Sequence, residues 1–138
     1  MSAFNVLNGA IYSRLVGGTA LVALLADSTS VYYQQAPDDA TLDYVVFSLQ
    51  GGGDENLTPH RTKNLLVFVR GYSRTSGAKA GQIDAACDAL LHGVELTVTG
   101  WQNFWLHRED DQALIETDQA GNKTHMAGGL YRCRIEKE

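Results

Sequence analysis

The sequence contains few cysteines, no excess of basic residues and no long apolar run. Its two cysteines, Cys87 and Cys133, both fall on expected apolar faces, one on a helix and one on a strand. This placement is typical of buried free thiols in a reducing compartment. A disulfide between them is possible only if the helix and the strand meet.

The charge balance is acidic, because 16 Asp and Glu residues outnumber 11 Lys and Arg residues and give a net charge of −5. This balance argues against a nucleic-acid binder with a general basic face and against a protein that binds anionic membranes. The apolar stretch at residues 15–26 is far too short to span a bilayer. No basic residue precedes Arg14, so we do not expect a secretion signal either.

Motifs for catalysis and for metal or cofactor binding are also missing. No serine lies in a G-x-S-x-G elbow, and the glycines at 51–53 lead to two acids rather than to the G-K-[ST] of a phosphate loop. No two histidines lie three or four residues apart, and no other ligand stands at metal-site spacing from them. The histidines are His60, His92, His107 and His125. We therefore expect no enzyme activity, no cofactor and no metal.

Three pairs of neighbouring carboxylates fall in expected turns. This placement indicates solvated side chains and not groups that carry out acid-base catalysis. They are Asp38-Asp39, Asp54-Glu55 and Asp110-Asp111. A small basic cluster lies at residues 60–63, and Arg132 and Arg134 lie on the expected outward face of the last strand. These cations are either solvated or contact an acidic partner or a neighbouring copy.

The length and the composition indicate one globular domain over residues 1–138. The chain is 44% hydrophobic and 20% charged, and a chain of this length can bury a core without disulfides or metals.

The chain is organised around residues 65–93, which predict a strand at 65–72 followed by a helix at 77–92. Apolar residues of this helix recur with a 3.6-residue period, and Gly93 ends it. They are Ile83, Ala86, Cys87, Leu90 and Leu91. A strand that is apolar on both faces needs cover on both sides, and this helix supplies one cover.

Two shorter helices are expected at residues 4–16 and 19–26, and such a helical hairpin usually covers a sheet. Further strands are expected at 31–34, 44–49, 94–99, 101–107, 113–117 and 131–136, with the 44–49 and 65–72 strands antiparallel. Asp110-Asp111 is expected to be a hairpin turn. Two glycine-rich stretches, at 51–63 and 119–129, are expected to be loops.

The predicted fold class is α+β, with a largely antiparallel sheet packed by an N-terminal helical hairpin and one central helix. The expected core residues are Phe4, Leu7, Ile11, Leu15, Val46, Val67, Val69, Ile83, Cys87, Leu90 and Leu91. Thr and aromatic residues at outward strand positions, beside two long loops, are also found in proteins that form rings or stacks.

Three stretches carry a family resemblance. In LVGGTALVALLADSTSVYYQQAPDDATLDYVVFSL, a short helix, a strand, an Ala-Pro turn and a second strand follow one another. The next stretch is LLVFVRGYSRTSGAKAGQIDAACDALLHG, and the chain ends with GLYRCRIEKE. In this order and spacing, the chain resembles the tail completion, or tail terminator, proteins of long-tailed phages and prophages. The resemblance covers nearly the whole length, although the loop at 51–63 is richer in glycine than the family's.

The resemblance implies a structural virion protein that can be monomeric before assembly and forms a hexameric ring in the tail. In the family, this ring caps the head-proximal end of the tail tube, stops tube polymerisation and presents a surface to the neck proteins of the head. The implied partners are other copies of the chain, the major tail tube protein and the head completion proteins, with DNA only passing through the lumen. The implied place is the virion tail, after assembly in the host bacterial cytoplasm.

The two loops are the expected sites of contact with the tube or with neighbouring subunits. Their candidate residues are Gly51, Gly52, Gly53, Asp54, Glu55, Asn56, His60, Arg61, Lys63, Gly121, Asn122, Lys123 and His125. Two alternatives stay open from the sequence: a neck or head-completion connector, and a small ligand-binding α+β module, which would need a concave pocket with converging polar groups.

Overall fold

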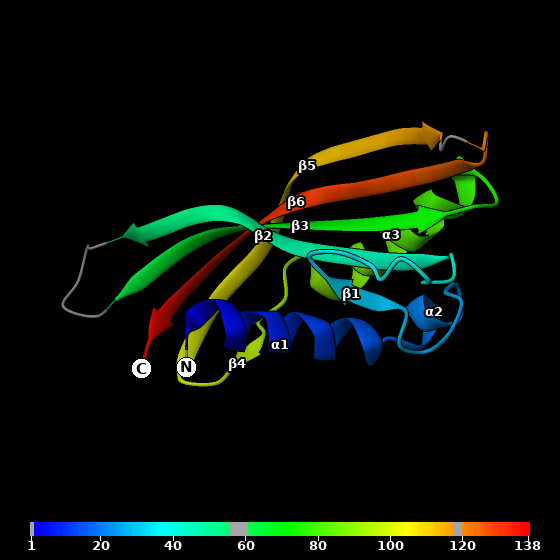
Figure 1. Ribbon diagram of the computed structural model, residues 1–138. Helices are drawn as coiled ribbons and strands as arrows, with labels where there is room; N and C mark the ends of the chain where they lie inside the picture. The colour runs from blue at the N-terminus through cyan, green and yellow to red at the C-terminus, as the bar shows by residue number, and fades with distance from the viewer. Residues whose placement is uncertain (1, 56–60, 118–119) are drawn as a thin grey trace.

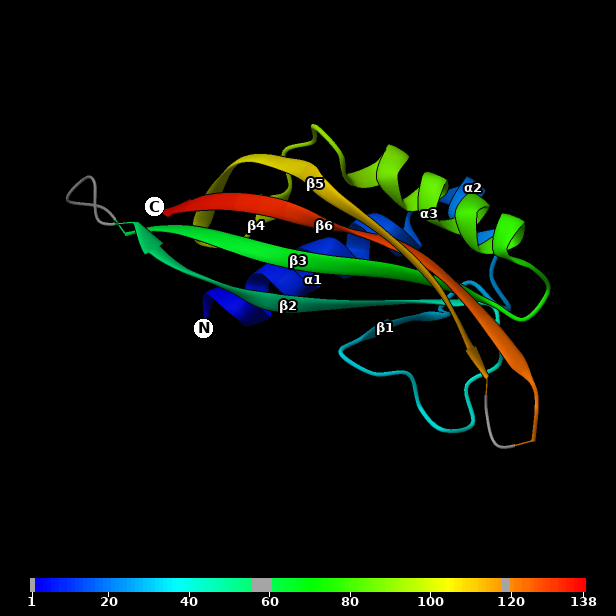
Figure 2. The same ribbon diagram turned by 90° about the horizontal axis from the view of Figure 1, so that it is seen from above.

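A computed structural model of the chain describes residues 2–55, 61–117 and 120–138, except the side chain of Phe104. A six-stranded sheet with the order β1-β2-β3-β6-β5-β4 forms its centre. The helices lie on one face of this curved sheet (Figures 1 and 2). The predicted α+β class, with a mostly antiparallel sheet, is confirmed.

The helices begin where the sequence places capping side chains. In α1 (Ala3–Val16), the Ser2 hydroxyl accepts a hydrogen bond from the Asn5 N–H. In α3 (Gly77–Leu91), the Ser76 hydroxyl accepts from the Lys79 N–H. The predicted second helix at 19–26 is too long, because α2 spans only Thr19–Val22 and then tightens into turns.

The strands are longer and more continuous than the sequence patterns indicate. Their bounds are β1 Val31–Tyr33, β2 Tyr44–Glu55, β3 Thr62–Ser73, β4 Thr97–Val98, β5 Trp101–Thr117 and β6 Lys123–Lys137. β1 is parallel to β2, and all other neighbouring strands are antiparallel. The long pairs β2–β3 and β5–β6 therefore form two hairpin arms.

Several segments that were predicted to be loops or turns are strands instead, because cross-strand pairing overrides their weak local strand propensity. Residues 51–55 continue β2, and residues 123–129 begin β6. The expected turn at Asp110-Asp111 instead lies inside β5, beside a bulge between Arg108 and Asp110. The expected strand at 94–99 is reduced to the two residues of β4.

The core lies between the helices and one face of the sheet, and most of the expected core residues are buried there. They are Leu7, Ile11, Leu15, Val67, Val69, Ile83, Cys87 and Leu91. Leu90 is only partly buried and packs against this cluster. Val46 is also buried, but it pairs with Arg70 on the opposite face of the sheet.

Phe4 was wrongly predicted to be a core residue, because its side chain is 48% exposed. The buried face of α1 is set by steps of four residues: Ala3, Leu7, Ile11 and Leu15. Phe4 is displaced by one residue from this row, which turns it about 100° around the helix.

Cys87 and Cys133 are both buried free thiols, as the sequence predicted. Burial raises the pKa of the Cys133 thiol to about 12, and it also raises the pKa of Cys87. Neither thiol is activated for chemistry.

The guanidinium of Arg108 joins α3 to β5 and β6. It donates two hydrogen bonds to the Asp84 carboxylate, at 2.8 and 2.9 Å, and it also donates to the Tyr131 hydroxyl and the Gly128 carbonyl. The Tyr131 hydroxyl in turn donates to Asp88 at 2.9 Å. The hydrogen bonds from Arg108 to Asp84 raise the pKa of Arg108, so this cation stays charged.

Gly129 makes room for this network. A Cβ atom at position 129 would lie 2.6 Å from the Arg108 Cζ atom and 2.7 Å from the Asp110 carbonyl. No side chain fits between the two strands without displacing the guanidinium.

The packing of α3 can be tested by removing apolar volume. We expect Leu91→Ala to lower the free energy of unfolding by about 2–5 kcal/mol, because Leu91 is 1% exposed. The matched control Ile115→Ala removes a side chain that is 61% exposed and should change the value by about 0.5 kcal/mol or less. Denaturant titration of both variants checks the difference, and equal losses would contradict the described packing.

The Arg108 network predicts a second stability effect. Arg108→Met removes both hydrogen bonds from the guanidinium to the Asp84 carboxylate, so we expect a loss of about 1.5–3 kcal/mol. Arg108→Lys should recover only part of this loss, since an ammonium cannot reproduce the two parallel hydrogen bonds to Asp84. The free energy of unfolding of both variants provides the measurement, and full stability of Arg108→Met would show that the network is dispensable.

Candidate assembly interface

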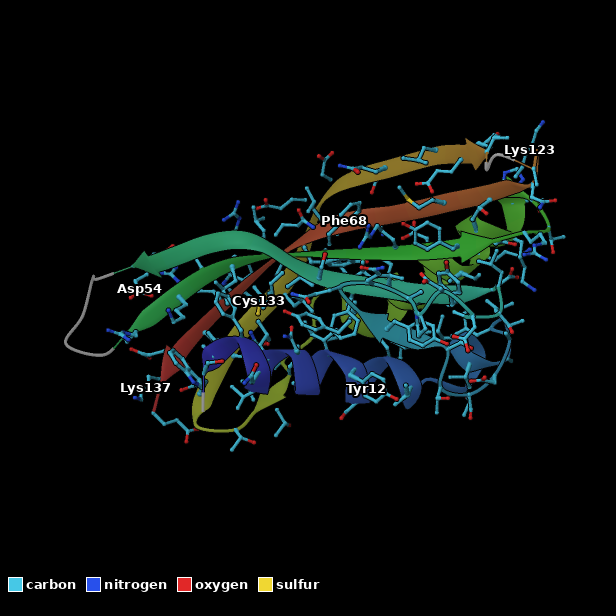
Figure 3. The ribbon with its side chains drawn as sticks, in the orientation of Figure 1. Tyr12, Asp54, Phe68, Lys123, Cys133 and Lys137 are labelled. Carbon is cyan, nitrogen blue, oxygen red and sulfur yellow. The ribbon has the colours of Figure 1, made fainter. Side chains whose placement is uncertain are left out.

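The two hairpin arms extend from the sheet toward opposite ends of the molecule (Figure 1). The β2–β3 arm carries Asp54, and the β5–β6 arm carries Lys123 (Figure 3). The two predicted contact segments therefore do not come together. They form two separate candidate contact regions on one subunit.

Glycines shape the β2–β3 arm instead of making it a loop. The register shifts between Leu49 and Gly51, and Gly51 and Gly52 have positive φ angles of 153° and 115°. A Cβ atom at Gly52 would lie 2.7 Å from the Leu65 Cα atom, so a side chain would push the strands apart. The glycine-rich sequence thus permits a bulge and a close approach of two strands.

Charged side chains tie this arm together. Asp54 accepts a hydrogen bond from Lys63 and lies 3.5 Å from Arg61. The hydrogen bond from Lys63 lowers the pKa of the Asp54 carboxyl. On the other face of the arm, Glu55 contacts Arg134 at 2.6 Å, so Arg134 is not simply solvated. Arg132 likewise contacts Glu109 at 2.6 Å.

The remaining candidates divide between the second arm and the part of the chain outside the described residues. Asn56 and His60 lie outside the described residues. Gly121 adopts a positive φ of 85°, and the exposed Lys123 pairs with Thr117 at the end of the β5–β6 arm. Asn122 lies between them, while His125 is partly buried beside Ser73 and Ile115 in the ladder.

The face of the sheet opposite the helices carries a row of tyrosines from three strands. The ring of Tyr44 lies 5.7 Å from that of Tyr32 and 5.5 Å from that of Tyr72. Burial raises the pKa of both Tyr44 and Tyr72. Nearby, the guanidinium of Arg70 lies 4.9 Å from the centre of the Phe68 ring. Aromatic and arginine side chains on an uncovered face are typical of protein contact surfaces.

Sequence reasoning noted outward aromatic residues, but it missed that these side chains form one surface. The register places Tyr44 opposite Tyr72, and Tyr32 opposite the neighbouring Val46. The alternation of each strand was the available signal, but only the strand order brings the three rings together.

A smaller hollow of about 260 Å³ lies at the N-terminal end of α1. Its wall includes the exposed Phe4 ring, Trp101 and three cations, which are Arg61, Lys63 and Lys137. The sequence did not predict this hollow, since Phe4 was assigned to the core and Lys137 was not connected with the basic cluster at residues 60–63.

A larger hollow, of about 650 Å³, lies between α1 and residues 95–99. Its ionisable side chains are Arg14 and Glu95, and the Arg14 Nε–H donates to the Leu90 carbonyl. Within the described residues, no three His, Cys, Asp or Glu side chains gather in a way that could hold a metal ion. No described helix is long and apolar enough to cross a membrane.

Comparison with known proteins agrees with the fold. The chain is similar to a chain from the structure of the virion of a native gene transfer agent particle, with a TM-score of 0.78, 20% identity and coverage of 98% of both chains. A second solved structure, named only by a protein identifier, has a TM-score of 0.56 and 14% identity, over 97% of this chain and 94% of the other. At these identities the likeness concerns the fold alone. No curated protein matches the sequence.

The family comparison goes further than the fold. The family model of the tail completion protein gp17 matches residues 9–135, which include α3 and nearly the whole sheet with both of its arms. The chain therefore belongs to the tail completion protein family, and it is a structural, virion-associated tail protein.

Proposed function

We propose that the chain forms a ring, expected to be hexameric, on the head-proximal end of the phage tail tube. The ring ends tube polymerisation and offers a surface to the neck proteins of the head. The observation that carries this proposal is the pair of arms, which extend toward opposite ends of one subunit (Figure 1). Such a subunit has different surfaces at its two ends, as a head-to-tail ring requires.

A terminator has to bind the last ring of the tube and yet prevent the binding of another tube ring. Its two ring faces must therefore differ in chemistry. The subunit has this asymmetry, because one face of its sheet is covered by helices and the other presents tyrosines, Phe68 and Arg70. Members of the family are structural proteins of the tail, so we infer that the chain acts by binding and not by catalysis.

The proposed partners are the major tail tube protein, neck and head completion proteins and other copies of the chain. The net charge of −5 suits a subunit whose ring lets DNA pass without retaining it. Assembly would take place in the host bacterial cytoplasm, where subunits meet the growing tube.

Removal of the protein from the virus tests this function. We expect a stop codon in the reading frame to produce headless tails of uncontrolled length in electron micrographs of the lysate, because nothing would cap the tube. Plasmid-borne wild-type protein should restore particles with tails of one length. Tails of normal length beside separate filled heads would assign the protein to the neck instead, and intact infectious particles would contradict both structural functions.

Shortening the β2–β3 arm tests its proposed contact with the tube or with a neighbouring subunit. Replacement of residues 54–63 by Asn-Gly joins Gly53 to Asn64, which already face each other in the ladder, through a favourable hairpin turn. We expect the thermal unfolding midpoint to stay near that of the wild type while tail capping is lost. An unfolded variant would show that the arm stabilises the core, and normal capping would exclude the arm from the contact.

A further inference from the structure

The distal half of β5 is an open strand edge. Near its start, β5 pairs with β4 at Trp101 and Gln102. Farther along, the Gly93 N–H donates to the Leu106 carbonyl at 2.6 Å, and the Arg108 N–H donates to His92 Nδ1 at 3.0 Å. Beyond Arg108, the described strand pairs only with β6.

This open edge lacks two of the features that usually keep edge strands from pairing with other chains, proline and lysine. Every residue from 111 to 117 is exposed. Two of its exposed side chains are large and apolar: Leu114 is 44% exposed and Ile115 is 61% exposed. The β5 edge, defined here as residues 110–117, is therefore a surface that is suited to a partner.

The charge of the β5 edge is of one sign. Asp110, Asp111 and Glu116 are acidic, and the segment has no basic residue. Asp111 contacts Arg108, but its side chain stays 83% exposed. A partner for this edge should thus combine an apolar contact with positive charge.

The same molecule carries such a surface at its other end. The basic hollow, defined here by Phe4, Arg61, Lys63, Trp101 and Lys137, combines an exposed aromatic ring with three cations. Asp54 is paired with two of these cations, yet the Arg61 side chain remains 60% exposed. The hollow is lined by residues at the N-terminal end of α1. The β5 edge belongs to the β5–β6 arm, which extends toward the opposite end of the molecule (Figures 1 and 2).

We propose that the β5 edge of one copy docks into the basic hollow of the next copy, with Ile115 against Phe4 and the β5 carboxylates against the cations. The two patches differ and lie at opposite ends of the subunit, so their contact is head-to-tail. Each copy then binds one neighbour through its β5 edge and the other neighbour through its basic hollow. Such a contact closes into a ring when the rotation per subunit fits. This inference rests on the proposed ring and names the surfaces that join its subunits.

Cysteine cross-linking in assembled particles tests the contact. Phe4→Cys and Ile115→Cys are introduced together into the chain of the phage or prophage that encodes it, and particles are treated with a short bis-maleimide. Cys87 and Cys133 are 1% and 0% exposed, so the native thiols stay unmodified. We expect a ladder of cross-linked multimers that ends at the closed ring.

The matched control is Tyr12→Cys with Ile115→Cys, because Tyr12 lies on the same helix as Phe4, is 37% exposed and does not line the hollow. We expect it to give no ladder. A ladder in the control as strong as in the test pair, or no ladder in the test pair, would overturn the proposed contact.

Charge exchange provides an independent test. Glu116→Lys and Arg61→Glu should each lower the yield of complete particles at least tenfold, and the double variant should restore most of it. Both side chains are exposed, so the purified variants should keep the wild-type unfolding midpoint. If both single variants lose particle yield and the double variant does not restore it, the proposed pairing of Glu116 with Arg61 is contradicted.

Counting subunits by quantitative mass spectrometry of the particles separates this inference from the proposed function. If the particles contain several copies per tail but the Phe4→Cys and Ile115→Cys positions do not cross-link, the proposed ring function is retained and only the assigned contact surfaces are overturned. A single copy in each tail would remove the ring and this contact together.

Discussion

The position of the β5–β6 arm depends on one partly buried cation. Arg108 lies where α3 crosses β5 and β6, and its guanidinium fills the space that Gly129 leaves open. Because Asp84 and Asp88 belong to the helix and Tyr131 to the sheet, the hydrogen bonds fix the helix against the strands. An apolar contact could not set this orientation as narrowly, since it has no direction.

With the helix fixed on one face, the opposite face of the sheet is left for contacts. The strands that are covered at the core continue beyond the helices as arms, where their side chains are exposed or paired with each other. The acidic β5 edge and the basic hollow therefore result from the same arrangement. Short helices on a long sheet leave uncovered surface at both ends, and a protein that works by assembly can use both.

Local patterns predicted α3 and the central strands well. The apolar residues of α3 recur with the helical period, and Ser76 and Gly93 flank the helix with residues that are typical of helix ends. The patterns failed where glycine or carboxylate residues suggested a turn. Gly51–Gly53 and Asp110-Asp111 lie in strands because β3 and β6 offer each of them a hydrogen-bonding partner far away in the chain.

The sequence by itself determined the class of the fold, the buried cysteines, the central helix and the resemblance to tail completion proteins. These features depend on periodicity, on single capping side chains and on the order of elements, which are all local. Only the tertiary structure decided which residues share a surface. Phe4, Arg61 and Lys137 are far apart in the sequence. They line one hollow because β3 pairs with β6 and α1 begins beside their ends, and no local pattern encodes this arrangement.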